Sequence, residues 1–173
     1  LSGLFYDTIT PYLAKNHTII SPDYPGYGAS DRPTDELSIE LWASSIAAVL
    51  KVLEIDYPCD VLGFHTGCLV ATELSLRYPE LVNRLVLIDL PYFNKTDRAE
   101  MLSKNSAPPG FNEDVKCIAD IWNMNVGTKL GKISTNRALE NLAEHLRTGE
   151  NANLGFKAAF TYDIDRINEI AHP

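Results

Sequence analysis

The feature that most constrains the fold is a stretch in which two apolar strands flank a turn and a helix. Residues 59–63 (CDVLG) and residues 84–89 (RLVLID) are short, largely apolar runs of strand length. Between them, residues 67–78 carry apolar side chains at helical spacing and stop before Pro79. Largely apolar strands that alternate with helices are typical of parallel strands covered by helices. The sequence therefore predicts an α/β fold with a partial, doubly wound parallel sheet.

Three earlier segments extend this alternation. Residues 17–21 (HTIIS) are rich in β-branched side chains and predict a buried strand. Ser38 is placed to cap the N-terminus of a helix over residues 39–53. Residues 5–14 predict a short helix that is interrupted by Pro11.

The pattern changes after Pro91, where helical periods continue without a strong strand. The predicted helices cover residues 113–124, 136–147 and 154–162. Because an all-helical stretch does not continue a sheet, we expect it to form a cap over one edge. The expected organisation is a core over residues 1–91 and an all-helical cap over residues 92–170 that leads towards a further strand.

Three motifs in the same order resemble the α/β-hydrolase family. Residues 22–30 (PDYPGYGAS) are similar to the loop after the family's fourth strand, and residues 63–67 (GFHTG) to its nucleophile elbow. Residues 77–89 (RYPELVNRLVLID) are similar to the helix exit and the sixth strand. Together they cover roughly residues 1–91, more than half of the chain. This resemblance implies the family's fold and, as an expectation, hydrolase activity.

The resemblance also assigns roles within the turn. His65 stands at the nucleophile position, where the backbone is strained and the side chain projects over the edge of the sheet. Gly63 and Gly67 are expected where neighbouring backbone leaves no room for a Cβ atom. The backbone N–H of Thr66 matches the family's oxyanion donor, at a helix N-terminus that favours negative charge.

The family usually has Ser, Asp or Cys where this chain has His65, so several interpretations stay open. Imidazole is a competent nucleophile and titrates near neutrality, at a pKa of roughly 6.5 in model peptides. Acyl-imidazoles hydrolyse readily, however, and the alternative is an elbow kept for its structure after its nucleophile was lost. The hydroxyl of Thr66 is a third candidate nucleophile.

Three other residues have a functional and a structural interpretation. Asp89 ends the sixth strand, where part of the family carries a catalytic acid that orients a histidine; the alternative is a strand-end or capping role. Asp23 is expected to hold the amides of its loop. Cys68 is expected to pack the helix on the sheet rather than to react as a thiolate.

Aromatic side chains gather in the expected cap. Tyr92, Phe93 and Trp122 are the candidates for lining a substrate pocket, and ordinary packing within the cap is the alternative. The other aromatic residues considered with them are Phe111, Phe156, Phe160 and Tyr162.

The predicted function is hydrolysis of a small, largely apolar substrate at an ester-like or related bond, with His65 and Asp89 as catalytic residues. The first alternative is a non-catalytic protein of the same fold that binds a ligand or a partner. A third hypothesis uses the oxyanion site without a covalent intermediate, for addition–elimination or cofactor-free oxygen chemistry.

Composition narrows the partners. The formal net charge is −8, which disfavours nucleic acid and anionic membrane surfaces, and no apolar run is long enough for a membrane span. The three cysteines and four histidines lack metal-ligand spacing, so we expect no metal, no cofactor and reduced thiols in the cytoplasm. The expected partner is a small-molecule substrate, and the oligomeric state is left open.

The resemblance also implies that the chain is an internal fragment. An upstream loop that supplies a second oxyanion amide is expected before Leu1. The acid after the seventh strand and the histidine after the eighth are expected beyond Pro173.

Overall fold

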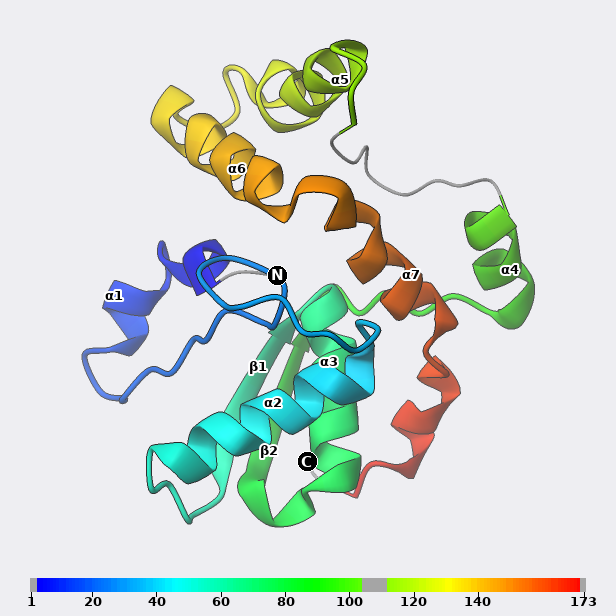
Figure 1. Cartoon of the computed structure of the whole chain (residues 1–173). Coiled ribbons are helices and arrows are strands. Elements are labelled where there is room, and N and C mark those ends of the chain that lie inside the picture. The colour runs from blue at the N-terminus through cyan, green and yellow to red at the C-terminus, as the bar shows by residue number, and fades with distance from the viewer. Residues whose placement is uncertain (1–2, 104–111, 172–173) are drawn as a thin grey trace.

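The computed structural model describes residues 3–103 and 112–171. A small parallel sheet and two neighbouring helices form one part, and a series of further helices extends over its upper end (Figure 1). The helices and strands, in chain order, are α1 (Thr10–Leu13), α2 (Ile39–Val52), β1 (Cys59–Phe64), α3 (Thr66–Arg77), β2 (Val82–Ile88), α4 (Lys95–Ser103), α5 (Lys116–Asn125), α6 (Thr135–Thr148) and α7 (Leu154–Thr161).

The two strands pair in parallel, with Gly63 opposite Leu87 and Phe64 opposite Ile88. The strand–helix–strand unit and the parallel pairing predicted from the sequence are therefore confirmed. Helix α3 packs against both strands, and α2 packs against α3. In the part of the chain that the structure describes, Val86 and Ile88 on β2 remain about half exposed.

The core centres on α3, in which residues 67–75 are all buried. Trp42 on α2 is fully buried beside it and stacks on Tyr24, with ring centroids 5.5 Å apart. The indole N–H of Trp42 donates to the carbonyl oxygen of Pro25 at 3.1 Å. These contacts hold the Pro-Gly loop against α2, because burying large aromatic surface is strongly favourable.

Within that loop, Asp23 has the structural role that the sequence predicted. One carboxylate oxygen accepts from the amide of Gly3 at 2.6 Å, and the other accepts from the amide of Ala29 at 2.8 Å. Gly28 has a φ of +56°, and a Cβ atom there would lie 2.2 Å from the carboxylate carbon of Asp23. The loop is thus folded around this side chain.

The predicted helix cap at Ser38 is confirmed. Its backbone is extended, and its hydroxyl oxygen accepts from the amide of Leu41 at 3.1 Å. Helix α2 begins at Ile39, as expected, and ends one residue before the predicted end.

The predicted strand over residues 17–21 is wrong. Among the described residues this segment has no ladder partner, and a groove separates it from β1. A strand needs hydrogen bonds from a neighbouring backbone, and β-branched side chains alone do not supply them.

The predicted helix over residues 5–14 is split differently from the expectation. A 3₁₀ turn covers Gly3–Tyr6, and α1 covers only Thr10–Leu13. Pro11 lies in the first turn of α1 rather than at a break. Backbone N–H groups in the first turn have no intrahelical acceptor, so the N–H that proline lacks is not needed there.

After β2 the described chain is helical, which confirms the three helices predicted there. Helix α4 was missed, because its sequence KTDRAEMLS carries too few apolar residues to show a helical period. We call α4 to α7 and the 3₁₀ turn Ile164–Glu169 the helical region. Its role as a cap, and the boundary between residues 91 and 92, stay predictions. None of the helices in residues 3–103 and 112–171 combines the length and the apolar character needed to cross a bilayer.

Candidate active site

The turn between β1 and α3 places His65 at the carboxyl end of the sheet. Its φ of 49° and ψ of −119° are unfavourable for a residue with a Cβ atom. Its amide donates to the carbonyl oxygen of Ile88 at 3.0 Å, and its own carbonyl accepts from the amide of Cys68 at 2.9 Å. Its side chain is exposed. The neighbouring strand and the following helix thus hold a strained residue with its imidazole facing outward.

The two glycines of the turn differ in how strictly they are required. A Cβ atom at Gly63 would lie 2.5 Å from the carbonyl oxygen of Gly67, which is far too close for backbone contact. A Cβ atom at Gly67 would lie 3.4 Å from the hydroxyl of Tyr6, an ordinary contact. The close approach expected at both positions is therefore strict only at Gly63.

Thr66 is the first residue of α3. Helix geometry leaves the first-turn amides of Thr66 and Gly67 without an intrahelical acceptor. The partial positive charge of the helix N-terminus adds to these two donors. The Thr66 hydroxyl lies 3.4 Å from Nδ1 of His65, near the limit for a hydrogen bond. The backbone N–H of Thr66 is therefore better placed to stabilise an oxyanion than its hydroxyl is to act as a nucleophile.

Asp89 lies next to this turn because β1 and β2 end in register. Phe64 pairs with Ile88, so His65 and Asp89 are the residues that follow two adjacent strand ends. Asp89 also has a positive φ, 55°, and an exposed side chain. In the described parts of the chain, no hydrogen bond joins its carboxylate to the His65 ring. The parallel register thus brings the two predicted catalytic residues to the same edge.

Cys68 lies underneath the turn and is fully buried. Its thiol donates to the carbonyl oxygens of Gly63 at 3.3 Å and Ile88 at 3.2 Å. Burial raises the pKa of the thiol, and the charge of Asp89 raises it further. The thiol stays protonated, which agrees with the packing role predicted for it.

A small cavity of about 50 Å³ lies between His65 and the helical region. Its other walls include Phe93, Phe156 and Phe160, whose rings pack together with centroids 4.4 to 5.4 Å apart. Among the described residues of the lining, Arg98 is the one with a permanently cationic side chain. The cavity therefore offers a mainly apolar surface directly beside the imidazole.

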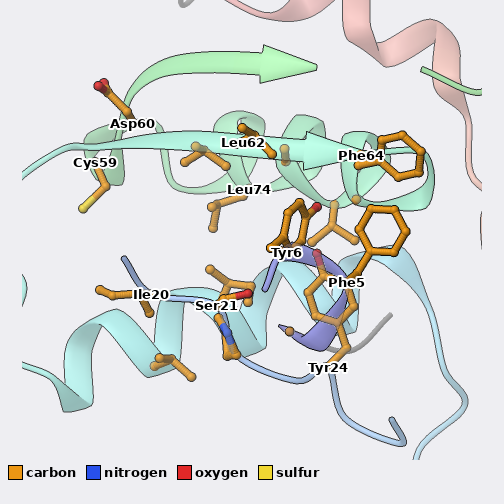
Figure 2. A pocket seen from close by; sticks show the side chains of 18 of the residues that line it. Phe5, Tyr6, Ile20, Ser21, Tyr24, Cys59, Asp60, Leu62, Phe64 and Leu74 are labelled. Carbon is orange, nitrogen blue, oxygen red and sulfur yellow. The ribbon is translucent and has the colours of Figure 1, made fainter. Parts of the chain in front are cut away.

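A second, larger groove of about 400 Å³ runs along β1 (Figure 2). Its lining also includes His65 and Thr66. Tyr6 and Tyr24 point into it from the segments before α2. Burial raises the pKa of both phenols, so both remain protonated and able to donate. Most of this groove extends away from His65 along the edge of the strand, so the smaller cavity is the better candidate for substrate.

The predicted pocket residues have different surroundings. Phe93 lines the small cavity. Tyr92 is about half exposed, and its hydroxyl donates to Asp165 at 2.9 Å. Trp122 is about half exposed on α5 and is not part of the cavity lining. Phe111 lies outside the described residues.

Sequence reasoning did not identify the roles of two charged residues, Arg98 in the cavity lining and Glu73 in the core. Arg98 lies on the polar helix α4, where nothing distinguishes it from a solvent-exposed cation. Glu73 is the one charged residue in the stretch 67–75 of α3, which otherwise holds apolar and small polar residues, and this setting was the available signal. Within residues 3–103 and 112–171, no group of three or more His, Cys, Asp or Glu side chains is arranged to hold a metal ion.

Comparison with known proteins matches the chain to one protein family, and two curated relatives and one solved structure are described with it. Residues 2–116 match the family described as alpha/beta hydrolase fold. The 2-hydroxymuconate semialdehyde hydrolase of Pseudomonas sp. (strain CF600) is 40% identical over 81 residues, which is 46% of this chain and 28% of that protein. The pimeloyl-[acyl-carrier protein] methyl ester esterase of Neisseria meningitidis is 32% identical over 111 residues, 64% of this chain and 40% of that protein.

Among solved structures, a hydrolase from Pseudomonas aeruginosa PA01 aligns with a TM-score of 0.76 and 20% identity. The alignment covers 99% of this chain and 65% of that structure. The matches thus span less than half the length of the two curated relatives and about two thirds of the solved structure.

Proposed function

Because this chain belongs to the alpha/beta hydrolase fold family, we propose that it functions in hydrolysis of a small, largely apolar substrate at an ester-like bond. The observation that carries the proposal is the placement of His65. A strained turn holds its imidazole at the N-terminus of α3, beside a cavity with aromatic walls. Backbone strain of this kind is concentrated at functional sites.

In the proposed reaction a ring nitrogen of His65 attacks the acyl carbon of the substrate. The tetrahedral species collapses and expels the alcohol, which takes up the proton released from the acylated ring. Water then attacks the acyl-imidazole, releases the carboxylic acid and restores the ring. The ready hydrolysis of acyl-imidazoles makes the second step fast.

The oxyanion of each tetrahedral species is stabilised by backbone amides rather than by a charged side chain. The amides of Thr66 and Gly67 point out of the first turn of α3. This role of Thr66 does not depend on its hydroxyl. In a mainly apolar surrounding, such donors act more strongly than they do in water.

The cavity lining supports an apolar substrate. Phe93, Phe156 and Phe160 offer aromatic surface, which binds hydrocarbon groups through burial from water. Both curated relatives named above are hydrolytic enzymes, and the one named as a methyl ester esterase supports an ester-like bond as the reacting group.

The test is hydrolysis of p-nitrophenyl acetate and p-nitrophenyl butyrate by the wild-type chain and by His65→Ala. We expect His65→Ala to lower kcat by at least about 100-fold, and acid-quenched samples of the wild type to carry an acyl group on the His65 peptide in mass spectra. Because free imidazole also cleaves such esters, His17→Ala is the matched control. His17 is an exposed histidine that lines neither cavity, and its removal should leave the rate unchanged.

Equal rates for His65→Ala and His17→Ala would contradict the proposal. Loss of turnover in His65→Ala without any acyl adduct would instead assign His65 as a general base in a reaction with no covalent intermediate.

A second candidate is a ligand-binding protein of the same fold. It is favoured by one observation: in the described residues, the His65 ring has no carboxylate as a hydrogen-bond partner to orient it. Under this alternative, apolar esters would bind in the cavity and slow the hydrogen exchange of the backbone amides around it. Neither ester would be cleaved faster by the wild type than by His65→Ala.

A further inference from the structure

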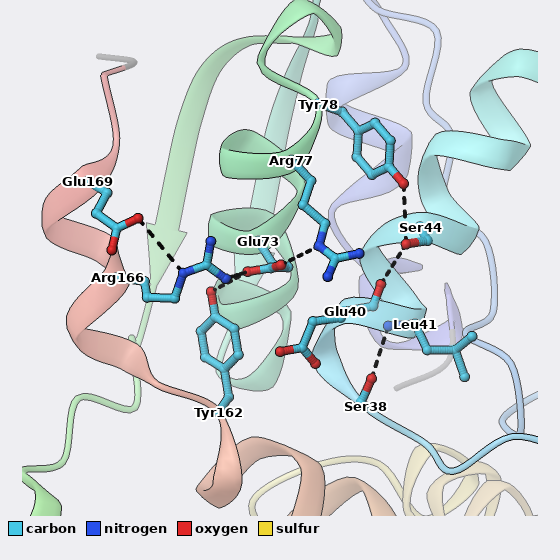
Figure 3. Close-up of polar contacts among 10 residues, drawn as sticks. All are labelled: Ser38, Glu40, Leu41, Ser44, Glu73, Arg77, Tyr78, Tyr162, Arg166 and Glu169. Atoms are coloured by element: carbon cyan, nitrogen blue, oxygen red, sulfur yellow. Dashed lines mark hydrogen bonds and ion pairs between the residues drawn. The ribbon is translucent and has the colours of Figure 1, made fainter.

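Glu73 on α3 is completely buried, although it carries a carboxylate. A buried charge without partners is strongly destabilising, so its surroundings must compensate. Its oxygens accept from Nε of Arg77 at 2.6 Å, from the hydroxyl of Tyr162 at 2.9 Å and from Nη1 of Arg166 (Figure 3). Two guanidinium groups and one hydroxyl thus surround a single carboxylate.

Two of these three partners come from the far end of the chain. Tyr162 follows the last residue of α7, and Arg166 lies in the turn Ile164–Glu169. They are 89 and 93 positions from Glu73 in the sequence. Burial raises the pKa of Tyr162, and the bond to Glu73 raises it further, so the hydroxyl remains a donor. The carboxylate therefore joins the core helix to the end of the helical region.

A second set of contacts extends this connection to the start of the helical region. Nη1 of Arg98 on α4 donates to the carbonyl oxygen of Tyr162 at 2.5 Å, and Nη2 lies 3.5 Å from the carboxylate of Asp163. The hydroxyl of Tyr92 donates to Asp165 at 2.9 Å. Both ends of the helical region are thus fastened to each other next to Glu73.

These fastened residues also form walls of the cavity beside His65. Arg98 and Ile164 line it directly, together with Phe160 at the end of α7. Any movement of α4 or α7 away from α3 would open the cavity. The contacts of Glu73 therefore fix how far these walls lie from His65.

We propose that Glu73 fixes the position of the helical region: its bonds to Tyr162 and Arg166 hold α4, α7 and the turn Ile164–Glu169 against the core beside His65. Without these bonds, that part of the chain moves away from α3 while the strands and α2 stay folded. Glu73 is a positioning residue, since it acts on the cavity only through the segments it holds. This role goes beyond the proposed hydrolysis and can be tested without any substrate.

The test is hydrogen–deuterium exchange, read by mass spectrometry, on the chain carrying Glu73→Gln. We expect amides of α4, α7 and residues 164–169 to exchange at least about ten times faster than in the wild type, since local opening is measured by exchange. Amides of β1, β2 and α2 should keep their rates. Tyr162→Phe removes one of the two connecting bonds and should give a smaller acceleration in the same segments.

Arg77→Gln is the matched control. Arg77 also binds Glu73, but it lies on the same helix, one turn away, so its loss leaves the connection to Tyr162 and Arg166 intact. Unchanged exchange in α4 and α7 of Glu73→Gln would overturn the proposal. So would equal acceleration of every segment, or the same selective acceleration in Arg77→Gln. If Glu73→Gln does not fold, the outcome for Tyr162→Phe decides in the same way.

Discussion

His65 and Asp89 both have a positive φ, and each follows directly after one of the two paired strands. Such a conformation is rare for residues other than glycine and persists only where surrounding contacts impose it. At His65 these contacts are the hydrogen bond from its backbone N–H to the carbonyl oxygen of Ile88 and the close approach of Gly63 to Gly67. The exposed imidazole is therefore a consequence of backbone packing beneath it.

Gly63→Ala tests this packing. The added Cβ atom would meet the carbonyl oxygen of Gly67 at 2.5 Å, so the turn must open or the strand must shift. We expect the free energy of unfolding to fall by about 2 to 4 kcal/mol, measured by urea denaturation. Gly67→Ala is the control, because its Cβ atom finds an ordinary contact at 3.4 Å and alanine is favoured in a helix; its effect should stay within about 1 kcal/mol. Equal losses for both variants would contradict the geometry of the turn.

At the scale of single elements, local signals decide where the core helices begin. The amphipathic helix α2 starts after Ser38, whose hydroxyl takes up one of the first-turn amides. Its buried face carries Ile39 and Trp42, both completely buried, so its first turn packs directly into the core. The cap thus stabilises the end of the helix on which the core depends most.

Ser38→Ala should lower the free energy of unfolding by about 1 kcal/mol, because the amide of Leu41 loses its acceptor. Ser38→Asp should restore most of that loss, since aspartate is an equally good N-cap residue and its charge is favourable at a helix N-terminus. Urea denaturation of the three proteins at neutral pH measures both effects. A loss in Ser38→Asp as large as in Ser38→Ala would show that the hydroxyl acts through another contact.

At the scale of the whole molecule, tyrosine hydroxyls connect the core to the helical region. The hydroxyl of Tyr27 accepts from the amide of Gly155 on α7 at 3.0 Å, and that of Tyr162 donates to Glu73 on α3. Burial raises the pKa of Tyr27 to about 12, and burial also raises the pKa of Tyr162. The Tyr162 contact requires a protonated phenol because its hydroxyl donates, whereas the hydroxyl of Tyr27 accepts and its pKa is raised by burial alone.

These raised pKa values predict a loss of stability in alkali. A phenol with a folded pKa above its unfolded value of about 10 stabilises the protein fully below pH 10. Above that pH the unfolded chain ionises first, so stability falls as the pH rises towards the folded pKa. For Tyr27 the loss at pH 11 should be about 1 kcal/mol. Urea denaturation at pH 8 and pH 11 should show a smaller difference for Tyr27→Phe than for the wild type, and an equal difference would exclude this contribution.

Local patterns along the chain were sufficient to predict most of the helices and strands. Apolar periodicity placed α2, α3, β1, β2 and the three later helices, because side-chain spacing along the chain sets which face is buried. The position of His65 between strand and helix followed instead from the resemblance of residues 63–67 to the nucleophile elbow of the α/β-hydrolase family. Helix α4 could not be predicted from periodicity, because its polar sequence shows no apolar period. It is held by contacts with distant residues, such as the bond from Arg98 to Tyr162.

Features that depend on partners far away in the sequence could be found only in the folded chain. Residues 17–21 have the composition of a strand, but no described neighbour pairs with them, and pairing is a property of two segments. The proposed role of Glu73 depends on its hydrogen bonds to Tyr162 and Arg166, which lie about 90 positions away in the sequence. The adjacency of Asp89 and His65 follows from the register of β1 with β2. A side chain's own neighbours in sequence fix its local conformation, whereas the partners of a buried charge or a strand edge are fixed only when the chain has folded around them.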